Sequence, residues 1–173
     1  MTKSGEVDLT LSSPLSALDP SLEFVELFES STKLLLPPNQ TLPKDEDVDL
    51  AYIARYPLIL YGPDTVLRAR LEHAFADEGL NYDIVMEMDN AAFVKRYVRI
   101  GMGIGLCSNF CLEPNDHNEM RIVDFDRILS SFTIGIHTLA GRFQSQSVRN
   151  FIDVLRNFEP LSSVLRNGRR SKQ

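Results

Sequence analysis

The sequence predicts an α/β fold built around a β-α-β-α-β unit between residues 56 and 110. The first observation is a set of short apolar runs, such as YPLILYG at 56–62, which are typical of strands covered on both faces. The second is that the segments between these runs carry apolar residues at helical spacing. Strands that alternate with single helices imply parallel neighbours joined by right-handed crossovers, so the unit should form a parallel sheet.

Two strands are predicted before this unit. VDLTLSS at 7–13 is typical of a short strand. STKLLLPP at 31–38 should be a buried strand, which Pro37 and Pro38 end because proline has no N–H to donate to a neighbouring strand. The polar segment that follows is expected to be a surface loop.

A helix is predicted directly after the strand at 56–62. Pro63 and Asp64 suit a helix start, and Gly79 suits a helix end. Four apolar residues of this segment fall on one helical stripe, namely Leu67, Leu71, Ala74 and Phe75.

The next strand is expected at 82–88 and the next helix over 89–101. We expect this helix to turn an apolar face inward and a basic face outward. The inward residues are Phe93, Val94, Tyr97 and Val98, and the outward residues are Lys95, Arg96 and Arg99.

Three further strands are predicted at 104–110, 120–125 and 132–140, and a last helix at 144–158. The last helix carries one apolar face, formed by Val148, Phe151, Ile152 and Leu155.

Three glycines alternate along YVRIGMGIGLC at 97–107, where a phosphate-binding loop has to be considered. A dinucleotide-binding loop needs the order strand, glycine turn, helix, so that a helix N-terminus faces the phosphates. Here the helix comes first, and a strand begins at Ile104. We therefore predict a helix-to-strand turn, in which Gly101 takes the left-handed conformation and Gly103 and Gly105 allow close packing.

The loops that follow the three parallel strands form the predicted ligand site. Such loops meet at one edge of a parallel sheet, where these folds bind ligands. Backbone amides at the helix starts favour a small anion or a polar metabolite. The alternative is that Asp64 and Asn90 only cap their helices. The loops contain Gly62, Pro63, Asp64 and Thr65, then Met88, Asp89 and Asn90, and then Cys107, Ser108 and Asn109.

Composition excludes several function classes. The net charge of −6 argues against nucleic-acid binding by this chain itself, because such binding depends on Lys and Arg. The basic stretch at the C-terminal end is expected to be solvated. No apolar run approaches the roughly 18 residues of a membrane span, and no secretory signal is visible, so we expect no membrane partner and a cytoplasmic location.

No metal site, cofactor or catalytic site is expected. Cys107 and Cys111 lie four residues apart without a second ligand pair at a zinc-site distance. His73, His117 and His137 have no partner at a recognisable catalytic spacing, and no nucleophile elbow or phosphate-binding motif occurs. The sequence therefore does not indicate an enzyme.

The residues from RYPLILYG to YVRIGMGIGLCSN closely resemble the effector-binding domain of LysR-type transcriptional regulators. GEVDLTLSSP is similar to an earlier strand of that family, and FTIGIHTLAGRFQSQSVRNFIDVL to its closing strand and helix. Within the family, the sequence is most similar to the branch that senses sulfur metabolites and controls cysteine biosynthesis. The residues that carry this similarity are Arg55, Tyr56, Tyr97, Val98 and Arg99.

The resemblance implies a periplasmic-binding-protein-like (type 2) domain with one complete Rossmann-like lobe and part of a second. It implies a small effector in the cleft between lobes, with sulfate, thiosulfate and cysteine precursors as candidates, and assembly as a homodimer or tetramer. The residues that match the family's effector loops or neighbour them are Gly62, Asp64, Thr65, Asp89, Asn90, Ser108 and Asn109.

Family members begin with a winged helix-turn-helix, a linker helix and the opening of the first lobe, which this sequence does not contain. We therefore expect a fragment or a natural remnant, in which DNA is contacted only through a winged helix-turn-helix outside this chain. The expected parts are a first-lobe strand and crossover (1–31), the second lobe (32–125), the first lobe's return strand and closing helix (126–160) and a basic tail (161–173).

The expected function is that of an effector-binding regulatory domain. The alternatives are a stand-alone metabolite-binding protein and a truncated regulator that acts by association with full-length homologues. The apolar face of the last helix would cover the first lobe's sheet in the family, so we expect either a dimer or a rearranged packing of residues 132–158.

Overall fold

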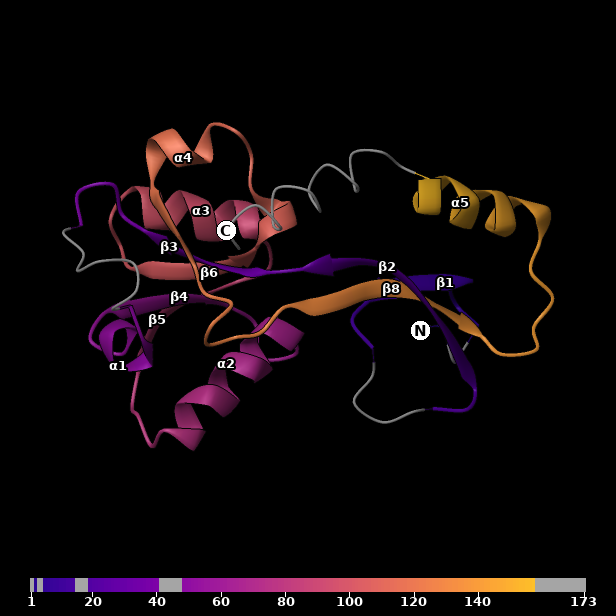
Figure 1. The fold of residues 1–173 in the computed structure, drawn as a ribbon, viewed down its shortest axis with the longest axis horizontal. Helices are drawn as coiled ribbons and strands as arrows, with labels where there is room; N and C mark the ends of the chain where they lie inside the picture. The colour runs from indigo at the N-terminus through magenta and orange to yellow at the C-terminus, as the bar shows by residue number, and fades with distance from the viewer. Residues whose placement is uncertain (1, 3–4, 15–18, 41–47, 158–173) are drawn as a thin grey trace. The chain divides into compact units, whose positions relative to one another are not determined.

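The computed structural model describes residue 2 and residues 5–14, 19–40 and 48–157, and it contains two compact units (Figure 1). Unit 1 comprises Met1–Ser30 and Phe132–Gln173, and unit 2 comprises Ser31–Ser131. The predicted basic tail at 161–173 lies outside the described residues. In the described part of the chain, no helix is long and apolar enough to cross a membrane.

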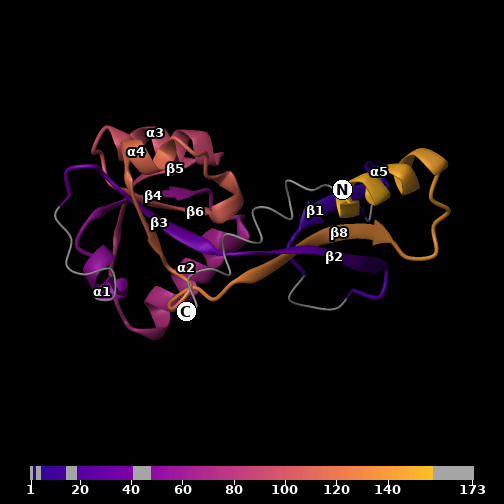
Figure 2. The same ribbon diagram turned by 45° about the horizontal axis from the view of Figure 1, so that its top comes forward.

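Unit 1 is built on an antiparallel sheet with the strand order β1-β8-β2. The central β8 buries Ile136, which lies opposite Leu11 of β1 and Val25 of β2. Helix α5 lies at one face of this sheet and buries Ile152 (Figure 2). The elements span Leu9–Ser12 (β1), Leu22–Ser30 (β2), Phe132–Leu139 (β8) and Gln146–Asn157 (α5).

Strand β2 is absent from the predicted elements. Its sequence, LEFVELFES, mixes glutamates with apolar residues in a way that breaks a strict two-residue alternation. The register with β8 shifts between Glu26 and Phe28, which marks a bulge or irregularity in the pairing. A bulge moves the following side chains to the other face, so the alternation that identifies a strand in a sequence is lost here.

Unit 2 contains a sheet of five strands in the order β5-β4-β6-β3-β7. The three strands of the predicted unit, β5, β4 and β6, are parallel, and β3 is antiparallel to both β6 and β7. The strands span Thr32–Leu36 (β3), Pro57–Tyr61 (β4), Asp83–Met88 (β5), Ile104–Ser108 (β6) and Arg121–Asp124 (β7).

Helices α2 and α3 cover opposite faces of the unit 2 sheet (Figure 1). Leu34 and Leu36 of β3 pack in one core cluster with residues of α2. Leu35, between them, packs in the other cluster with Val94 and Val98 of α3. The helices are Leu50–Ile53 (α1), Val66–Asp77 (α2), Ala91–Arg99 (α3) and Asp116–Glu119 (α4), with a 3-10 turn at Asn109–Cys111 (η2).

The glycine run is a helix-to-strand turn, as predicted. Gly101 has a φ of 83°, and its N–H donates to the Val98 carbonyl while the Met102 N–H donates to the Tyr97 carbonyl. These two bonds close the end of α3 in the way that a left-handed glycine permits. A Cβ on Gly105 would lie 2.6 Å from Val94 Cγ1, so this glycine lets β6 pack closely against α3.

Two predictions about the faces of α3 are wrong. Phe93, expected inside, is 45 % exposed, whereas Lys95, expected outside, is 5 % exposed. The helix buries Val94 and Val98 against the sheet as predicted, but the chain after β6 folds back over one flank of it. Acidic and carbonyl oxygens on that returning segment pair with Lys95, and this pairing compensates the burial of its charge.

Candidate functional site

Three loops lie at one edge of the unit 2 sheet because β5, β4 and β6 run in the same direction. Tyr61, the last residue of β4, lies opposite Met88, the last residue of β5. Ile59 of β4 lies opposite Gly105 of β6, and this register brings the ends of these two strands to within one residue of each other. Neighbouring strands are about 4.8 Å apart, so the loops are close neighbours. The first two loops begin at Gly62 and Asp89, and the third follows Ser108, the last residue of β6.

The first loop leaves the start of α2 without a side-chain cap. Thr65 is the N-cap residue, but its hydroxyl donates to the Gly62 carbonyl oxygen at 2.9 Å instead of accepting from the helix. The first N–H groups of α2 therefore lack the acceptor that a capping side chain supplies, at the positive end of the helix dipole. Open space lies beside Gly62, where a Cβ would meet nothing within 4 Å.

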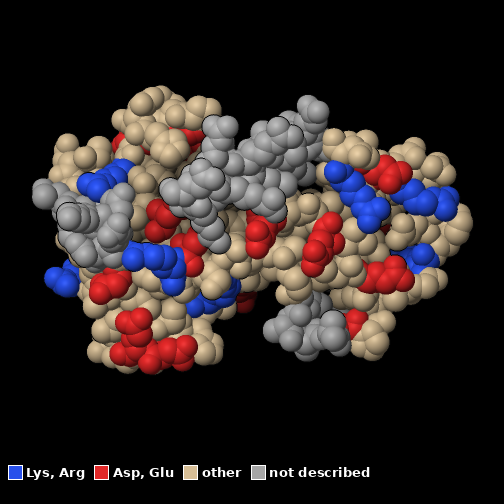
Figure 3. Space-filling model, viewed as in Figure 1, with Lys and Arg blue, Asp and Glu red and all other residues tan. Residues whose placement is uncertain are grey.

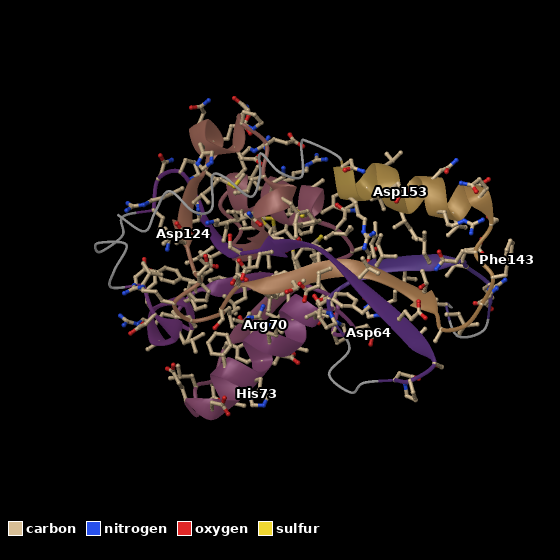
Figure 4. All side chains as sticks on the ribbon, turned by 45° about the vertical axis from the view of Figure 1, so that its right-hand side comes forward. Asp64, Arg70, His73, Asp124, Phe143 and Asp153 are labelled. Atoms are coloured by element: carbon tan, nitrogen blue, oxygen red, sulfur yellow. The ribbon has the colours of Figure 1, made fainter. Side chains whose placement is uncertain are left out.

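Asp64 does not cap α2, so that alternative interpretation is wrong. Its side chain is exposed at the start of the helix, next to the N-cap residue Thr65 (Figure 4). The carboxylate is therefore a charged group beside the loop rather than a structural partner of the helix.

The second loop is capped. Asn90 Oδ1 accepts a hydrogen bond from the Phe93 N–H at 3.2 Å, which is the usual N-cap arrangement. The alternative interpretation of Asn90 as a helix cap is therefore correct. Asn90 and Asp89 are both exposed at this edge of the sheet.

The third loop is held against the start of β3. The Asn109 N–H donates to the Ser31 carbonyl at 2.9 Å, and the Ser31 N–H donates to Asn109 Oδ1 at 3.1 Å. Asn109 is therefore used in joining two backbone segments. Ser108, directly before it, is 9 % exposed and lies opposite Thr32 of β3.

Two residues on the predicted loops belong to the core instead. Cys107 is fully buried, and Met88 packs against the same cluster on the α3 side of the sheet. Burial raises the pKa of the Cys107 thiol to about 12, and burial also raises that of Cys111. Both cysteines are free and stay protonated near neutral pH, so neither is a poised nucleophile.

None of the three histidines belongs to these loops. His73 is on α2, far from the helix start marked by Asp64, and its Nδ1 lies 3.0 Å from Asp77 Oδ2 (Figure 4). His117 is exposed on α4, and His137 is buried in unit 1 with Nε2 3.0 Å from the Ser13 carbonyl. Among the described residues, no group of three or more His, Cys, Asp and Glu could hold a metal ion.

An ion-pair network behind the third loop was not predicted. Lys95 Nζ donates to Asp116 Oδ2 at 2.8 Å and to the Cys111 carbonyl at 3.0 Å. Asp116 Oδ2 also accepts from the Glu113 N–H at 2.8 Å. The network fixes the segment that follows Ser108 onto α3. The sequence gives no sign of it, because Lys95 and Asp116 are far apart in the chain.

A second buried cation lies closer to the edge. Arg68 of α2 is 6 % exposed, and its Nη1 donates to the Tyr61 carbonyl at 3.1 Å and to Glu87 Oε1 at 3.2 Å. Its Nε donates to Glu72 Oε1 at 2.7 Å. Arg68 therefore ties the first turn of α2 to the ends of β4 and β5. The i,i+4 spacing of Arg68 and Glu72 is the signal that could have indicated part of this arrangement.

Comparison with known families identifies the chain. The family model described as the LysR substrate binding domain matches residues 1–159. The chain belongs to this family. The resemblance stated from the sequence is thereby confirmed, and the fold is the periplasmic-binding-protein-like (type 2) α/β fold of LysR effector-binding domains.

Curated relatives of this LysR domain are bacterial transcriptional regulators. The HTH-type transcriptional regulator cbl of Escherichia coli strain K12 is 28 % identical over 154 residues, which cover 89 % of this chain and 49 % of that protein. The regulator CysB of Burkholderia cenocepacia is 27 % identical over 152 residues, which cover 87 % and 48 %. The chain thus spans about half the length of the curated relatives it matches.

Solved structures of LysR-type effector-binding domains have the same fold as this chain. The cofactor-binding domain of the Cbl transcriptional regulator has a TM-score of 0.78 at 26 % identity, covering 96 % of this chain and 73 % of that one. The effector-binding domain of QuiR, solved with shikimate, has a TM-score of 0.73 at 18 % identity, covering 98 % and 75 %. The second likeness concerns the fold alone.

Proposed function

We propose that this LysR effector-binding domain senses a small anionic metabolite at the carboxyl edge of the unit 2 sheet. The observation that carries the proposal is the uncapped start of α2 beside Gly62, level with Ser108. A helix start supplies N–H donors and the positive end of a dipole, which together favour an anion. Arg68 does not compete for the ligand, since its guanidinium is occupied by Tyr61, Glu72 and Glu87.

The proposed ligand class is a sulfur oxyanion or a cysteine precursor. The regulators CysB and SsuR of Burkholderia cenocepacia, at 27 % identity each, are relatives from the sulfur-related branch that the sequence resembles. Sulfate and thiosulfate are the simplest members of this class, and each presents several oxygens to the hydroxyl and N–H donors of the three loops.

DNA contact is assigned to a winged helix-turn-helix outside this chain. Acidic and basic side chains are interspersed on the face shown in Figure 3, without a continuous basic surface there. The net charge of −6 gives the same indication. A regulator of this kind acts in the bacterial cytoplasm, where we place the protein.

Self-association, as a dimer or tetramer, is part of the proposal. Phe151 and Val154 of α5 are 48 % and 60 % exposed, and Phe143 just before the helix is 83 % exposed. Apolar side chains gathered on one helix favour association. The same observation supports the second candidate function, in which the chain pairs with full-length homologues and modulates them.

Isothermal titration calorimetry of the chain with sulfate, thiosulfate and O-acetylserine, at constant ionic strength, tests the proposal. We expect saturable binding of at least one of them and its loss in Ser108→Ala. The matched control is Ser13→Ala, since Ser13 is equally buried in unit 1. Absence of saturable binding to all three compounds contradicts the proposed ligand class, and unchanged binding by Ser108→Ala contradicts the location.

A further inference from the structure

We infer that the side-chain hydroxyl of Thr32, the first residue of β3, is an additional effector-binding group beside Ser108. This inference rests on the proposed effector site and extends it to a segment that no loop of the β-α-β-α-β unit contains. The ligand chemistry that it implies is an oxygen-rich small anion held by hydroxyl donors.

The first argument is that the Thr32 hydroxyl, like that of its neighbour Ser31, is buried without a hydrogen-bond partner. Thr32 is fully buried and Ser31 is 8 % exposed, and neither Ser31 Oγ nor Thr32 Oγ1 has a partner. Buried polar groups in folded proteins are nearly always paired, so an unpaired one calls for an explanation. The unpaired hydroxyl of Thr32, at the end of β3 opposite Ser108, indicates a place where a ligand supplies the missing partner.

The second argument is that the backbone around these hydroxyls is fully engaged. The Thr32 N–H donates to Asp126 Oδ1 at 2.9 Å, and the Thr32 carbonyl accepts from the Phe125 N–H at 3.1 Å. Ser31 exchanges two hydrogen bonds with Asn109. The backbone contacts therefore hold this segment in place, and the hydroxyls take no part in holding it.

The third argument is the position of Thr32 relative to Ser108. The two residues are directly opposite each other in the pairing of β3 with β6. Side chains alternate along a strand, so Thr32 lies on the same face as Leu34, and Ser108 on the same face as Leu106. Leu34 and Leu106 both pack in the cluster that contains the apolar residues of α2. Opposite residues have Cβ atoms about 5 Å apart, which is a distance that one small anion can bridge.

The side of the sheet also matters. Because Thr32 and Ser108 lie on the α2 side, their hydroxyls share that side with the uncapped helix start at Thr65. A hydroxyl has one O–H donor, so it can bind an anion as a donor. The combination of hydroxyls and helix N–H groups suits an oxyanion better than a cation, which would need carboxylates instead.

The test compares Thr32→Val with wild type by titration with sodium thiosulfate and sodium sulfate at constant ionic strength. Valine keeps the shape of threonine and removes the hydroxyl. We expect about a tenfold or greater rise in Kd and an unchanged or raised Tm of the ligand-free protein, since the substitution removes an unpaired buried polar group. Thr138→Val, at an equally buried threonine of unit 1, should bind like wild type.

Two further variants keep the result clear if Thr32→Val fails to fold. Thr32→Ser retains the hydroxyl and should keep wild-type affinity, and Thr32→Ala removes the hydroxyl in a smaller side chain and should weaken binding. Wild-type affinity in both Thr32→Val and Thr32→Ala overturns the inference while leaving the proposed function intact. Absence of saturable binding by the wild type is a different result, because it overturns the proposed oxyanion effector and this inference together.

Discussion

Lys95 of α3 donates a hydrogen bond to Asp116 of α4 across 2.8 Å, and both side chains are almost completely buried. Burial alone would lower the pKa of Lys95, but its contacts with Asp116 and Glu113 outweigh burial and raise it. Burial alone would raise the pKa of Asp116, but the hydrogen bonds from the Glu113 N–H and Lys95 outweigh burial and hold the pKa of this carboxyl below its usual range. The pair is therefore fully charged near neutral pH and fixes the segment after Ser108.

Removal of one partner should be strongly destabilising. Lys95→Met leaves Asp116 with less compensation for its burial, and we expect a loss of about 3 kcal/mol in the free energy of unfolding. Urea denaturation followed by circular dichroism measures it. Arg96→Met, at an exposed position of the same helix, is the control. The double variant Lys95→Met, Asp116→Leu should lose less than the sum of the two single variants, and strict additivity would show that the pair is not coupled.

The pH dependence of stability should reveal the same pair. In an unfolded chain the side-chain pKa is about 3.9 for Asp and about 10.4 for Lys. The folded pKa of Asp116 is lower, so its contribution is present above about pH 4 and is lost as pH falls through the folded value. The folded pKa of Lys95 is higher, so its contribution is present below about pH 10 and is lost as pH rises through the folded value.

The measurement is the difference in unfolding free energy between the wild type and the double variant, from acid to alkaline pH. This difference in unfolding free energy should be constant between about pH 4 and about pH 10, and it should decrease below and above these limits. A difference that changes steadily across neutral pH would contradict the assignment.

Alanine at Gly103 should destabilise the fold by about 1 to 3 kcal/mol. Its Cβ would overlap the Pro57 carbonyl oxygen, which belongs to backbone and cannot rotate away. Gly62→Ala is the matched control, because a Cβ there meets nothing within 4 Å and should change stability by less than about 0.5 kcal/mol. Thermal denaturation of the two variants side by side decides the question, and equal effects would contradict the close approach at Gly103.

The two helix starts of the site should respond differently to alanine. Asn90→Ala removes a capping hydrogen bond from α3 and should cost about 1 kcal/mol in stability. Thr65→Ala removes no cap and should cost less than about 0.5 kcal/mol. If Thr65 lies at the effector site, its variant should lose affinity for thiosulfate with little change in Tm. A larger loss of Tm in Thr65→Ala than in Asn90→Ala would reverse the assignment of the caps.

The parallel core of unit 2 was predictable because local patterns specify it. Continuous apolar runs and helical stripes each lie within one element, and Gly79 and Gly101 mark both helix ends by their left-handed conformation. Single-helix crossovers make the three strands parallel, which brings Gly62, Asp89 and Ser108 to one edge. The order β5-β4-β6 also requires α2 and α3 on opposite faces of the sheet, which the local patterns do not specify.

The missed features depend on partners distant in the chain. Lys95 has the pattern of an exposed residue and is buried only because the segment around Asp116 folds over it. Thr32 has the pattern of an ordinary strand residue, and its unpaired hydroxyl becomes evident only when its neighbours are known. Strand β2 was not predicted, because the register shift between Glu26 and Phe28 breaks the alternation of its side chains. In each case tertiary context overrides the local pattern.

Ser30 at the end of β2 lies directly opposite Phe132 at the start of β8, and all of unit 2 is encoded between them. Unit 2 is thus an insertion at the junction of two neighbouring strands, and the two ends of the inserted segment leave from adjacent positions. Such an arrangement permits residues 31–131 to be excised as one continuous gene segment or replaced by a short turn. The residues of the candidate site, together with Thr32, would all be transferred with that segment.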